Sequence, residues 1–459
     1  MDAEHYRAEL EKVIAGRPWL VATDILVFAV AQAKELQELG ASKVFALGAS
    51  RGTGEVEADF PTADLALAKA PDMMTGIRAS EAALELPPAP VQAAIDAFDP
   101  AGEARVIRAL FSADRPVAGR APWGTRPDRW AALEDKMRVD TFWDAAGVPR
   151  APSAIVPIAE AGEAHARLDA GAGTVWVADN RTGWHGAAQY LRWVRDDPGA
   201  AAAAAELGEV ADRVRVMPFL EGIPCSMHGF VFPDGQTIAL RACEMLVLRT
   251  PGSARLAYAA ASTFWLPRDE DAEAMRTATL RTAARLRDAH GYVGSFTVDG
   301  VVTEEGFRPT ELNPRFGAAI ARLAKGEPRL PLYLLHLALT AGEDLDYRPK
   351  GLETLLVEAS LKKPAGSAWR GVPRAVEARE AALVVDEGVR FAAEGETPTF
   401  RVRMGPGVTG GIVFVDPEPA RVSLGPPLAP RVAAAFNFLD AEWELGLEPV
   451  EAAKDVRPR

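Results

Sequence analysis

Residues 291–317, GYVGSFTVDGVVTEEGFRPTELNPRFG, contain the pattern from which the fold is predicted. The run 293–298 is rich in aromatic and β-branched residues, which are typical of strands. Asp299-Gly300 is a dipeptide that favours two-residue hairpin turns, and 301–303 begins a return strand. The stretch therefore predicts a β-hairpin that turns at Asp299-Gly300.

A second turn at 304–306 leads to another short strand, 307–312, followed by Asn313. Side chains two residues apart on a strand project from one face, so Glu311 and Asn313 are expected on the same face. Asp299, on the partner strand, is expected across from them. Two carboxylates and an amide oxygen are hard ligands that suit Mg²⁺ holding phosphates. The alternative is a solvated hairpin with ordinary surface acids, because short motifs also arise by chance.

The five residues 311–315, Glu-Leu-Asn-Pro-Arg, resemble the Glu-x-Asn-x-Arg signature of the ATP-grasp superfamily. The resemblance implies that Glu311 and Asn313 bind magnesium and that Asp299 is the third ligand. Arg315 then supplies a planar cation for a phosphate or a carboxylate. An ATP-grasp core that binds ATP is thus expected around this hairpin.

The composition is that of a soluble globular protein with several domains, since 48% of the 459 residues are hydrophobic and 25% are charged. The net charge of −13 argues against a nucleic-acid partner, because phosphate-backbone binding needs clustered Lys and Arg. No apolar run approaches the roughly 20 residues of a membrane span, and the charged N-terminus lacks a signal-peptide core. Cys225 and Cys243 are expected to be packing residues. These features predict a cytoplasmic protein with no membrane partner, and a homodimer is the default oligomer.

The N-terminal region is expected to be an α/β unit. An apolar strand-like run after residue 18, a helix over 31–39 and a buried strand over 43–47 suggest parallel strands joined by a helix. The second strand ends in Gly-Ala-Ser-Arg-Gly-Thr-Gly, 48–54, at the edge where open α/β sheets bind ligands. We expect its amides and Arg51 to help hold an anionic substrate group; the alternative is a plain loop.

Residues 134–136, Glu-Asp-Lys, are expected to open a helix that stops at 145–149, which contains Gly and then Pro. This segment resembles the entry to the ATP-grasp core, where the lysine contacts phosphate, so Lys136 is assigned that role. A surface lysine on an amphipathic helix is the alternative. The predicted strand 174–178 is similar to the family's lid strand but lacks the second lysine near its end, and Arg181 is the candidate to supply that charge.

A loop at 179–186 follows the lid strand, and 190–194 is expected to return as a strand. The resemblance implies that this loop is a glycine-rich flap over the phosphates, with Gly183 and Gly186 as nucleotide contacts. His185 is expected to make local hydrogen bonds and not to act in catalysis.

A strand over 213–217 followed by Pro-Phe-Leu-Glu-Gly, 218–222, resembles the ATP-grasp hinge. There adenine packs between two subdomains and bonds to backbone groups, which requires a flat apolar slot. The residues assigned to that slot are Met217, Phe219 and Leu220; a buried strand and turn would show the same residues. Many members of the family carry a ribose-binding Glu two residues after the hinge glycine. This chain has Pro224 there, and Glu221 is the candidate replacement.

The strand expected over 239–248 carries Arg241 and Glu244, which are interpreted as paired structural charges at a sheet edge. Arg249 follows directly. In an ATP-grasp fold these side chains would lie beside the metal strand, so Arg249 is a candidate to stabilise the γ-phosphate or an acyl phosphate.

The last part of the chain contains β-like runs separated by Gly and Pro turns, at 355–361, 382–385, 389–392, 400–404 and 412–415, and then a helix over 431–445. The expected domains are a pre-ATP-grasp domain at 1–125, a lid at 126–210, a nucleotide and metal subdomain at 211–345 and an α+β domain at 346–459. The expected fold class is therefore multidomain α/β and α+β, with an ATP-grasp core, a Rossmann-like N-terminal domain and a small C-terminal domain. This domain order is similar to that of the pheganomycin-type peptide ligases.

The resemblance implies an ATP- and Mg²⁺-dependent carboxylate–amine ligase. In such enzymes the carboxylate attacks the γ-phosphorus to give an acyl phosphate and ADP, and an amine then displaces phosphate to give an amide. The expected partners are a small-molecule carboxylate and an amino acid or short peptide. Positioning and charge neutralisation carry this chemistry, which suits the metal ligands together with Lys136, Arg249 and Arg315. Two alternatives stay open: a phosphotransferase on the same core, and a non-catalytic nucleotide-binding protein.

Overall fold

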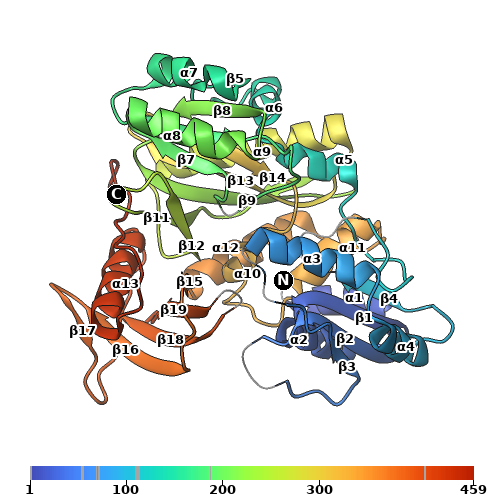
Figure 1. Ribbon diagram of the computed structural model, residues 1–459. Coiled ribbons are helices and arrows are strands. Elements are labelled where there is room, and N and C mark those ends of the chain that lie inside the picture. Colours follow the sequence, from blue (N-terminus) through green and yellow to red (C-terminus); the bar gives the residue numbers. More distant parts are fainter. Residues whose placement is uncertain are drawn as a thin grey trace.

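The computed structural model describes residues 3–52, 56–68, 70, 73–108, 114–186, 188–407 and 410–459. The described strands form two four-stranded sheets and one eleven-stranded sheet. Figure 1 shows one small sheet at the top, the N-terminal sheet at the lower right and the C-terminal strands at the lower left. The large sheet extends from the centre of that view to the lower left.

The N-terminal sheet is parallel, in the order β3-β2-β1-β4, which confirms the predicted α/β unit. Its elements are α1 (Ala3–Ile14), β1 (Pro18–Ile25), α2 (Leu26–Glu38), β2 (Lys43–Ser50), β3 (Thr62–Asp64), α3 (Met73–Glu85), α4 (Ala89–Phe98) and β4 (Arg105–Arg108). The predicted glycine-rich turn begins within β2. Its Thr53 and Gly54 lie outside the described residues, and Arg51 is exposed.

The second small sheet, called the lid sheet, is antiparallel in the order β5-β8-β6-β7. Its elements are β5 (Ala154–Pro157), η2 (Ile158–Glu160), α7 (Ala161–Leu168), β6 (Thr174–Ala178), β7 (Leu191–Val194), α8 (Asp197–Gly208) and β8 (Arg213–Pro218). The strands predicted at 174–178, 190–194 and 213–217 are thus confirmed to within one residue.

The helix predicted to open at 134–136 begins later. The chain before the lid sheet forms α5 (Asp128–Ala131), the 3₁₀ turn η1 (Ala132–Glu134) and α6 (Val139–Ala146). Asp135 Oδ1 accepts the backbone N–H of Met137 at 2.9 Å, a local turn bond that competes with helix formation. Glu134 and Lys136 therefore lie in a turn before α6.

The large sheet has the order β14-β13-β9-β11-β12-β15-β19-β18-β16-β17, and β10 pairs with β9. Its strands are β9 (Ile223–Val231), β10 (Thr237–Ala239), β11 (Cys243–Arg249), β12 (Leu256–Ser262), β13 (Gly294–Thr303), β14 (Gly306–Asn313), β15 (Gly366–Val372), β16 (Arg379–Val385), β17 (Val389–Phe391), β18 (Phe400–Pro406) and β19 (Gly411–Pro417). The helices of this part are α9 (Asp269–His290), α10 (Ile320–Leu323), α11 (Leu332–Ala341), α12 (Pro349–Lys362) and α13 (Ala429–Trp443). Cys225 and Cys243 are buried and free, as predicted.

The predicted hairpin turn at Asp299-Gly300 is wrong. β13 continues through both residues, and the chain turns at 304–305 instead. A β-bulge lies between Asp299 and Gly300, where a Cβ on residue 300 would lie 2.4 Å from the carbonyl oxygen of Arg308. The glycine is therefore needed for close approach of two strands. The register still places Asp299 directly opposite Glu311.

The strands after residue 365 extend the large sheet, because β15 pairs with β12. Four of the predicted runs in this part are confirmed as β16 to β19, and the last helix as α13. The strand predicted at 355–361 is wrong, because this run lies in α12. Leu352, Leu356 and Ala359 are buried on one face at spacings of four and three, which is a helical period. The ranges of the four predicted domains stay predictions.

Arg241 and Glu244 are not a charge pair, contrary to the prediction. Arg241 lies between β10 and β11 and donates to the backbone oxygens of Thr263 and Trp265. Glu244 is buried in β11 and accepts the N–H groups of Leu428 and Ala429, at 2.6 and 3.0 Å. The Glu244 carboxyl group therefore joins the large sheet to the N-terminus of α13, where it accepts backbone N–H groups that have no partner within the helix.

Glu244 is expected to make the free energy of unfolding depend on pH. Burial raises the pKa of Glu244 to about 7, although the two backbone hydrogen bonds lower it. Between the usual pKa of about 4.5 and this raised value the folded chain keeps a proton that the unfolded chain releases, so the contribution of Glu244 to stability is fully present below about pH 4.5 and is lost as the pH rises through about 7. Glu244→Gln should remove about 3 kcal/mol of this fall.

The measurement is the urea midpoint of the wild type and of Glu244→Gln between pH 4.5 and 8. Glu394→Gln, at an exposed position, is the matched control and should follow the wild type. A difference between the wild type and Glu244→Gln that stays constant with pH would contradict this prediction.

Among the described residues, no helix combines the length and apolar character that crossing a membrane requires.

Candidate functional site

A cavity of about 470 Å³ is lined by residues of both the lid sheet and the large sheet. Of the site residues predicted from the sequence, those lining it are Lys136, Gly186, Met217, Phe219, Leu220, Arg249, Asp299, Glu311, Asn313 and Arg315. Gly183 and Glu221 are not among the lining residues. Most of the predicted residues are therefore brought to one cavity, although they come from five separate segments of the chain.

The predicted metal ligands meet at adjacent positions on β13 and β14. Asp299 pairs with Glu311 across the two strands, and Asn313 Nδ2 donates to Asp299 Oδ2 at 2.8 Å. Ser226, on β9, donates to Asp299 Oδ1 at 2.6 Å. Lys136 Nζ donates to Glu311 Oε1 at 2.8 Å. Two carboxylates and one amide thus converge, as the spacing predicts, and Lys136, which the resemblance suggested, lies beside them.

The electrostatics of this acid pair favour a bound cation. Burial, and after it the neighbouring Glu311 carboxylate, raise the pKa of Asp299 above its usual value, and this rise outweighs the lowering by Ser226, Arg315 and Lys136. Within the described ranges, no group of three or more His, Cys, Asp or Glu side chains has the arrangement of a metal site. The donor set is nevertheless two carboxylates and one amide oxygen, the hard oxygens that Mg²⁺ takes when phosphates complete its coordination. The residues fit that ion.

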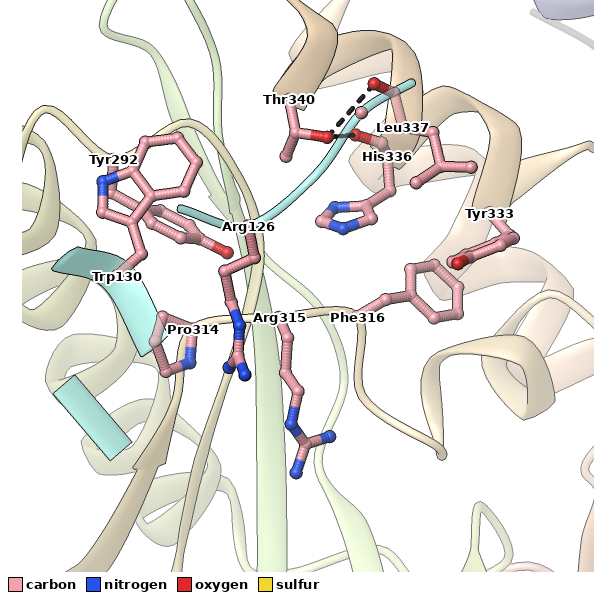
Figure 2. A pocket seen from close by; sticks show the side chains of 11 residues that line it. Arg126, Trp130, Tyr292, Pro314, Arg315, Phe316, Tyr333, His336, Leu337 and Thr340 are labelled. Carbon is pink, nitrogen blue, oxygen red and sulfur yellow. Dashed lines mark hydrogen bonds between the residues drawn. The ribbon is translucent and has the colours of Figure 1, made fainter. Parts of the chain in front are cut away.

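Arg315 leaves β14 in a turn beside a second, much smaller cavity of about 20 Å³. Its Nη2 donates to Asn313 Oδ1 at 3.1 Å, and its Nε donates to Glu134 Oε1 at 2.8 Å. Figure 2 shows the guanidinium groups of Arg126 and Arg315 pointing the same way. The small cavity is large enough for about one water molecule.

The predicted hinge connects β8 of the lid sheet to β9 of the large sheet. Met217, Phe219 and Leu220 line the large cavity there and provide an apolar slot. Gly222 makes the crossing possible, because its φ is +142° and a Cβ would lie 2.0 Å from the carbonyl oxygen of Val302. This end of the cavity suits a flat apolar ring.

Arg249 does not lie beside the metal ligands, where it is predicted, and Glu221 lies at the hinge paired with it. Their side chains form a bidentate ion pair, at 2.6 and 3.0 Å, and Arg249 also lies over the ring of Phe219. Glu244 of β11 pairs with Cys225 of β9, and the neighbouring Ser226 pairs with Asp299, so this end of β11 lies near Asp299 and Glu311. Arg249 is five residues further along β11, which is a distance of about 16 Å. Arg249 thus lies at the hinge, away from the acid pair, and the Glu221 carboxylate is already engaged.

The flap, residues 182–186, lies at the acid end of the cavity. Trp184, His185 and Gly186 all line the cavity. His185 is buried, and its Nε2 lies 3.0 Å from the carbonyl oxygen of Ala178, which is the local hydrogen bond predicted for it. Arg181 instead pairs with Asp212 at 2.8 Å and is not a lining residue.

Three site residues escape prediction from the sequence. Ser226 and Trp184 are ordinary members of a strand and a loop, and Glu134 precedes Asp135 without any motif of its own. Only the register of β9 against β13 could have indicated Ser226, since it pairs with Asp299. The burial of Glu134 depends on contacts with distant segments.

No protein-family model matches the sequence, and no curated protein matches it. Among solved structures, the chain is similar to an ADP complex of N5-carboxyaminoimidazole ribonucleotide synthetase, with a TM-score of 0.53 at 12% identity over 94% of this chain and 98% of that chain. It is similar to a complex of biotin carboxylase from Campylobacter jejuni, with a TM-score of 0.54 at 12% identity over 89% of each chain. The chain has the ATP-grasp fold.

A third similar structure, the L-amino acid ligase from Bacillus licheniformis, has a TM-score of 0.50 at 11% identity over 95% of this chain and 98% of that chain. These ATP-grasp structures confirm the predicted fold class along nearly the whole chain. The narrower likeness to pheganomycin-type peptide ligases stays a prediction. At such low identity the likeness concerns the fold alone.

Proposed function

We propose that this protein is an ATP- and Mg²⁺-dependent carboxylate–amine ligase. One observation carries the proposal: an acid pair, a lysine and an arginine lie at one end of a cavity whose other end is an apolar hinge. The fold around them is the ATP-grasp fold. Charged groups suited to phosphates at one end and a flat apolar slot at the other match the two halves of a nucleotide.

The apolar end is proposed to hold adenine. Met217, Phe219 and Leu220 line it, and backbone groups of the hinge would make the hydrogen bonds. Arg249 and Glu221 support this end through their ion pair, which braces the hinge against β11. The phosphates then extend along β13 toward Asp299, so that Lys136 and Arg315 neutralise their charge.

Asp299, Glu311 and Asn313 are the residues proposed to hold Mg²⁺. The ion, when bound, would draw charge from the phosphate oxygens and make the γ-phosphorus a better electrophile. Ser226 orients the Asp299 carboxylate through a 2.6 Å hydrogen bond. Asn313 is oriented in the same way by Arg315.

The proposed reaction has two steps. A carboxylate oxygen bonds to the γ-phosphorus while the bond to the bridging oxygen of ADP breaks, which gives an acyl phosphate. An amine then bonds to the acyl carbon, inorganic phosphate leaves, and the nitrogen gives up a proton to form the amide. An acyl phosphate hydrolyses in water, so the flap over the acid end is proposed to exclude solvent.

The test is ADP release against a panel of amino acids, other small carboxylates and short peptides, with mass spectrometry of the same mixtures. Wild-type protein with MgATP should release ADP only when an acid and an amine are both present. The product should equal the two reactants minus one water. A product heavier by a phosphoryl group would instead establish a phosphotransferase. ATP binding without turnover across the panel would favour the non-catalytic alternative.

A further inference from the structure

Glu134 lies at the end of η1, two residues before Lys136, and its side chain is completely buried. Its Oε1 accepts a hydrogen bond from Arg126 Nη1 and another from Arg315 Nε, the latter at 2.8 Å. Its Oε2 accepts one from Trp184 Nε1 at 2.5 Å. One buried carboxylate therefore joins three segments of the chain, namely the turn before the lid, the turn after β14 and the flap.

The carboxylate is held in its charged form. Burial opposes ionisation, but Arg315, Arg126 and Lys136 outweigh it and keep the pKa of Glu134 below its usual value. A buried carboxylate accepts strong hydrogen bonds from charged donors. It is also planar, so the direction of one oxygen fixes the direction of the other. The contact of Trp184 with Oε2 thus restricts the direction in which Oε1 faces Arg315.

Trp184 is the flap residue that reaches into the site. Its ring lies against Gly186, where a Cβ would be only 3.1 Å away, and its carbonyl oxygen accepts a hydrogen bond from Arg78 of α3 at 3.3 Å. The indole also lines the large cavity. The flap therefore cannot lie in this position without placing the Trp184 indole against Glu134.

We propose that Glu134 is a positioning residue that couples closure of the flap to the orientation of Arg315. With the flap closed, Trp184 fixes Oε2, and Oε1 holds the Arg315 guanidinium toward Asn313 and the acid pair. When the flap lifts, Oε2 loses its donor and the carboxylate is free to rotate away from Arg315. The role of Arg315 in catalysis rests on the proposed function, whereas the coupling itself does not.

Trypsin cleavage after Arg181, at the edge of the flap, measures flap opening in the protein alone. Trp184→Phe keeps an aromatic ring in the flap but removes the indole N–H and part of the ring that lies against Gly186, a change in size that the control variant below reproduces. It should speed cleavage after Arg181 about 10-fold, because a hydrogen bond to a charged acceptor is lost. Trp443→Phe is the matched control, since the Trp443 Nε1 atom has no hydrogen-bond partner among the described residues. It should leave this cleavage unchanged. Equal cleavage of Trp184→Phe and the wild type would overturn the proposal.

Glu134→Gln tests the coupling directly. It keeps the size of the side chain, presents an amide to the two arginines and should speed cleavage after Arg181 as Trp184→Phe does. The double variant should be cleaved no faster than the faster single variant, because both changes break one contact. Independent, multiplying effects would overturn the proposal. If Glu134→Gln fails to fold, the comparison of Trp184→Phe with Trp443→Phe still decides.

The link to catalysis is read separately, from ADP formation at saturating ATP. Trp184→Phe should lower kcat about 10-fold with little change in KM for ATP. The reason is that the variant disturbs the orientation of Arg315 and leaves the residues that bind ATP in place. Trp443→Phe should retain wild-type kcat. An unchanged kcat in Trp184→Phe would overturn the coupling to Arg315. If the wild type forms no ADP with any substrate, the proposed function fails, while the cleavage rates still decide whether Glu134 holds the flap.

Discussion

Glu311→Ala is expected to lower the rate of ADP formation by about 100- to 1000-fold. The variant loses one of the two paired carboxylates on β13 and β14 and the 2.8 Å partner of Lys136. With one carboxylate gone, Mg²⁺ is held more weakly and the charge on the transferring phosphoryl group is less well neutralised. The measurement is ADP release at saturating ATP over a range of Mg²⁺ concentrations, so that weaker metal binding and slower chemistry are separated.

Glu305→Ala is the matched control for this prediction. Glu305 lies in the turn of the same hairpin, is mostly exposed and pairs with Arg308 at 3.0 Å. Its loss should leave ADP formation unchanged, because exposed ion pairs contribute little. Full activity in Glu311→Ala would rule out the proposed metal ligands. Equal losses in both variants would point to general damage to the hairpin.

Asp140→Ala is expected to lower the free energy of unfolding by about 3–5 kcal/mol. Asp140, in α6, is the partner of Arg215, whose side chain is almost completely buried in β8. Arg215 Nε lies 3.0 and 3.1 Å from the two carboxylate oxygens, and its Nη1 donates to the backbone oxygen of Thr310 in β14. Removing the carboxylate leaves a buried guanidinium charge unpaired at the point where the lid meets the metal strand.

The measurement is the urea midpoint, with Asp144→Ala as its control on the same helix. Asp144 pairs with Arg150 at 2.9 Å but is mostly exposed, so its loss should cost less than about 1 kcal/mol. Similar shifts in the two variants would mean that the Arg215 charge is solvated or finds another partner.

Strands β13 and β14, which carry the predicted metal ligands, show what the local sequence pattern predicts correctly. Strict alternation places Glu311 and Asn313 on one face of β14, and this prediction holds because the period of a strand is set by its own backbone. Asp299 also lies opposite Glu311, as predicted, even though the turn between them is misplaced. Asp-Gly marks a β-bulge here because the strand partner approaches too closely for any side chain.

Arg249 and its pairing with Glu221 show where such reasoning fails. Each is plausible alone as a ligand for phosphate or ribose, but the antiparallel register of β11 and β9 places Arg249 at the hinge, in contact with Glu221. The spacing of residues along the sequence does not determine which strands pair, because strands that are far apart in the sequence can hydrogen-bond as readily as strands joined by a short turn. The same holds for Glu244, which meets α13 after 184 intervening residues.

The sequence alone determined the features that depend on backbone period and on short motifs. These are the parallel N-terminal unit, the lid strands, the face that carries Glu311 and Asn313, and the fold class implied by the Glu-x-Asn-x-Arg resemblance. The tertiary structure decided what depends on contacts between distant segments. It joined the C-terminal strands to the large sheet, paired Arg249 with Glu221 and buried Glu134 between two arginines and the flap. Burial and charge pairing are properties of the packed chain, because they follow from which surfaces exclude water from each other.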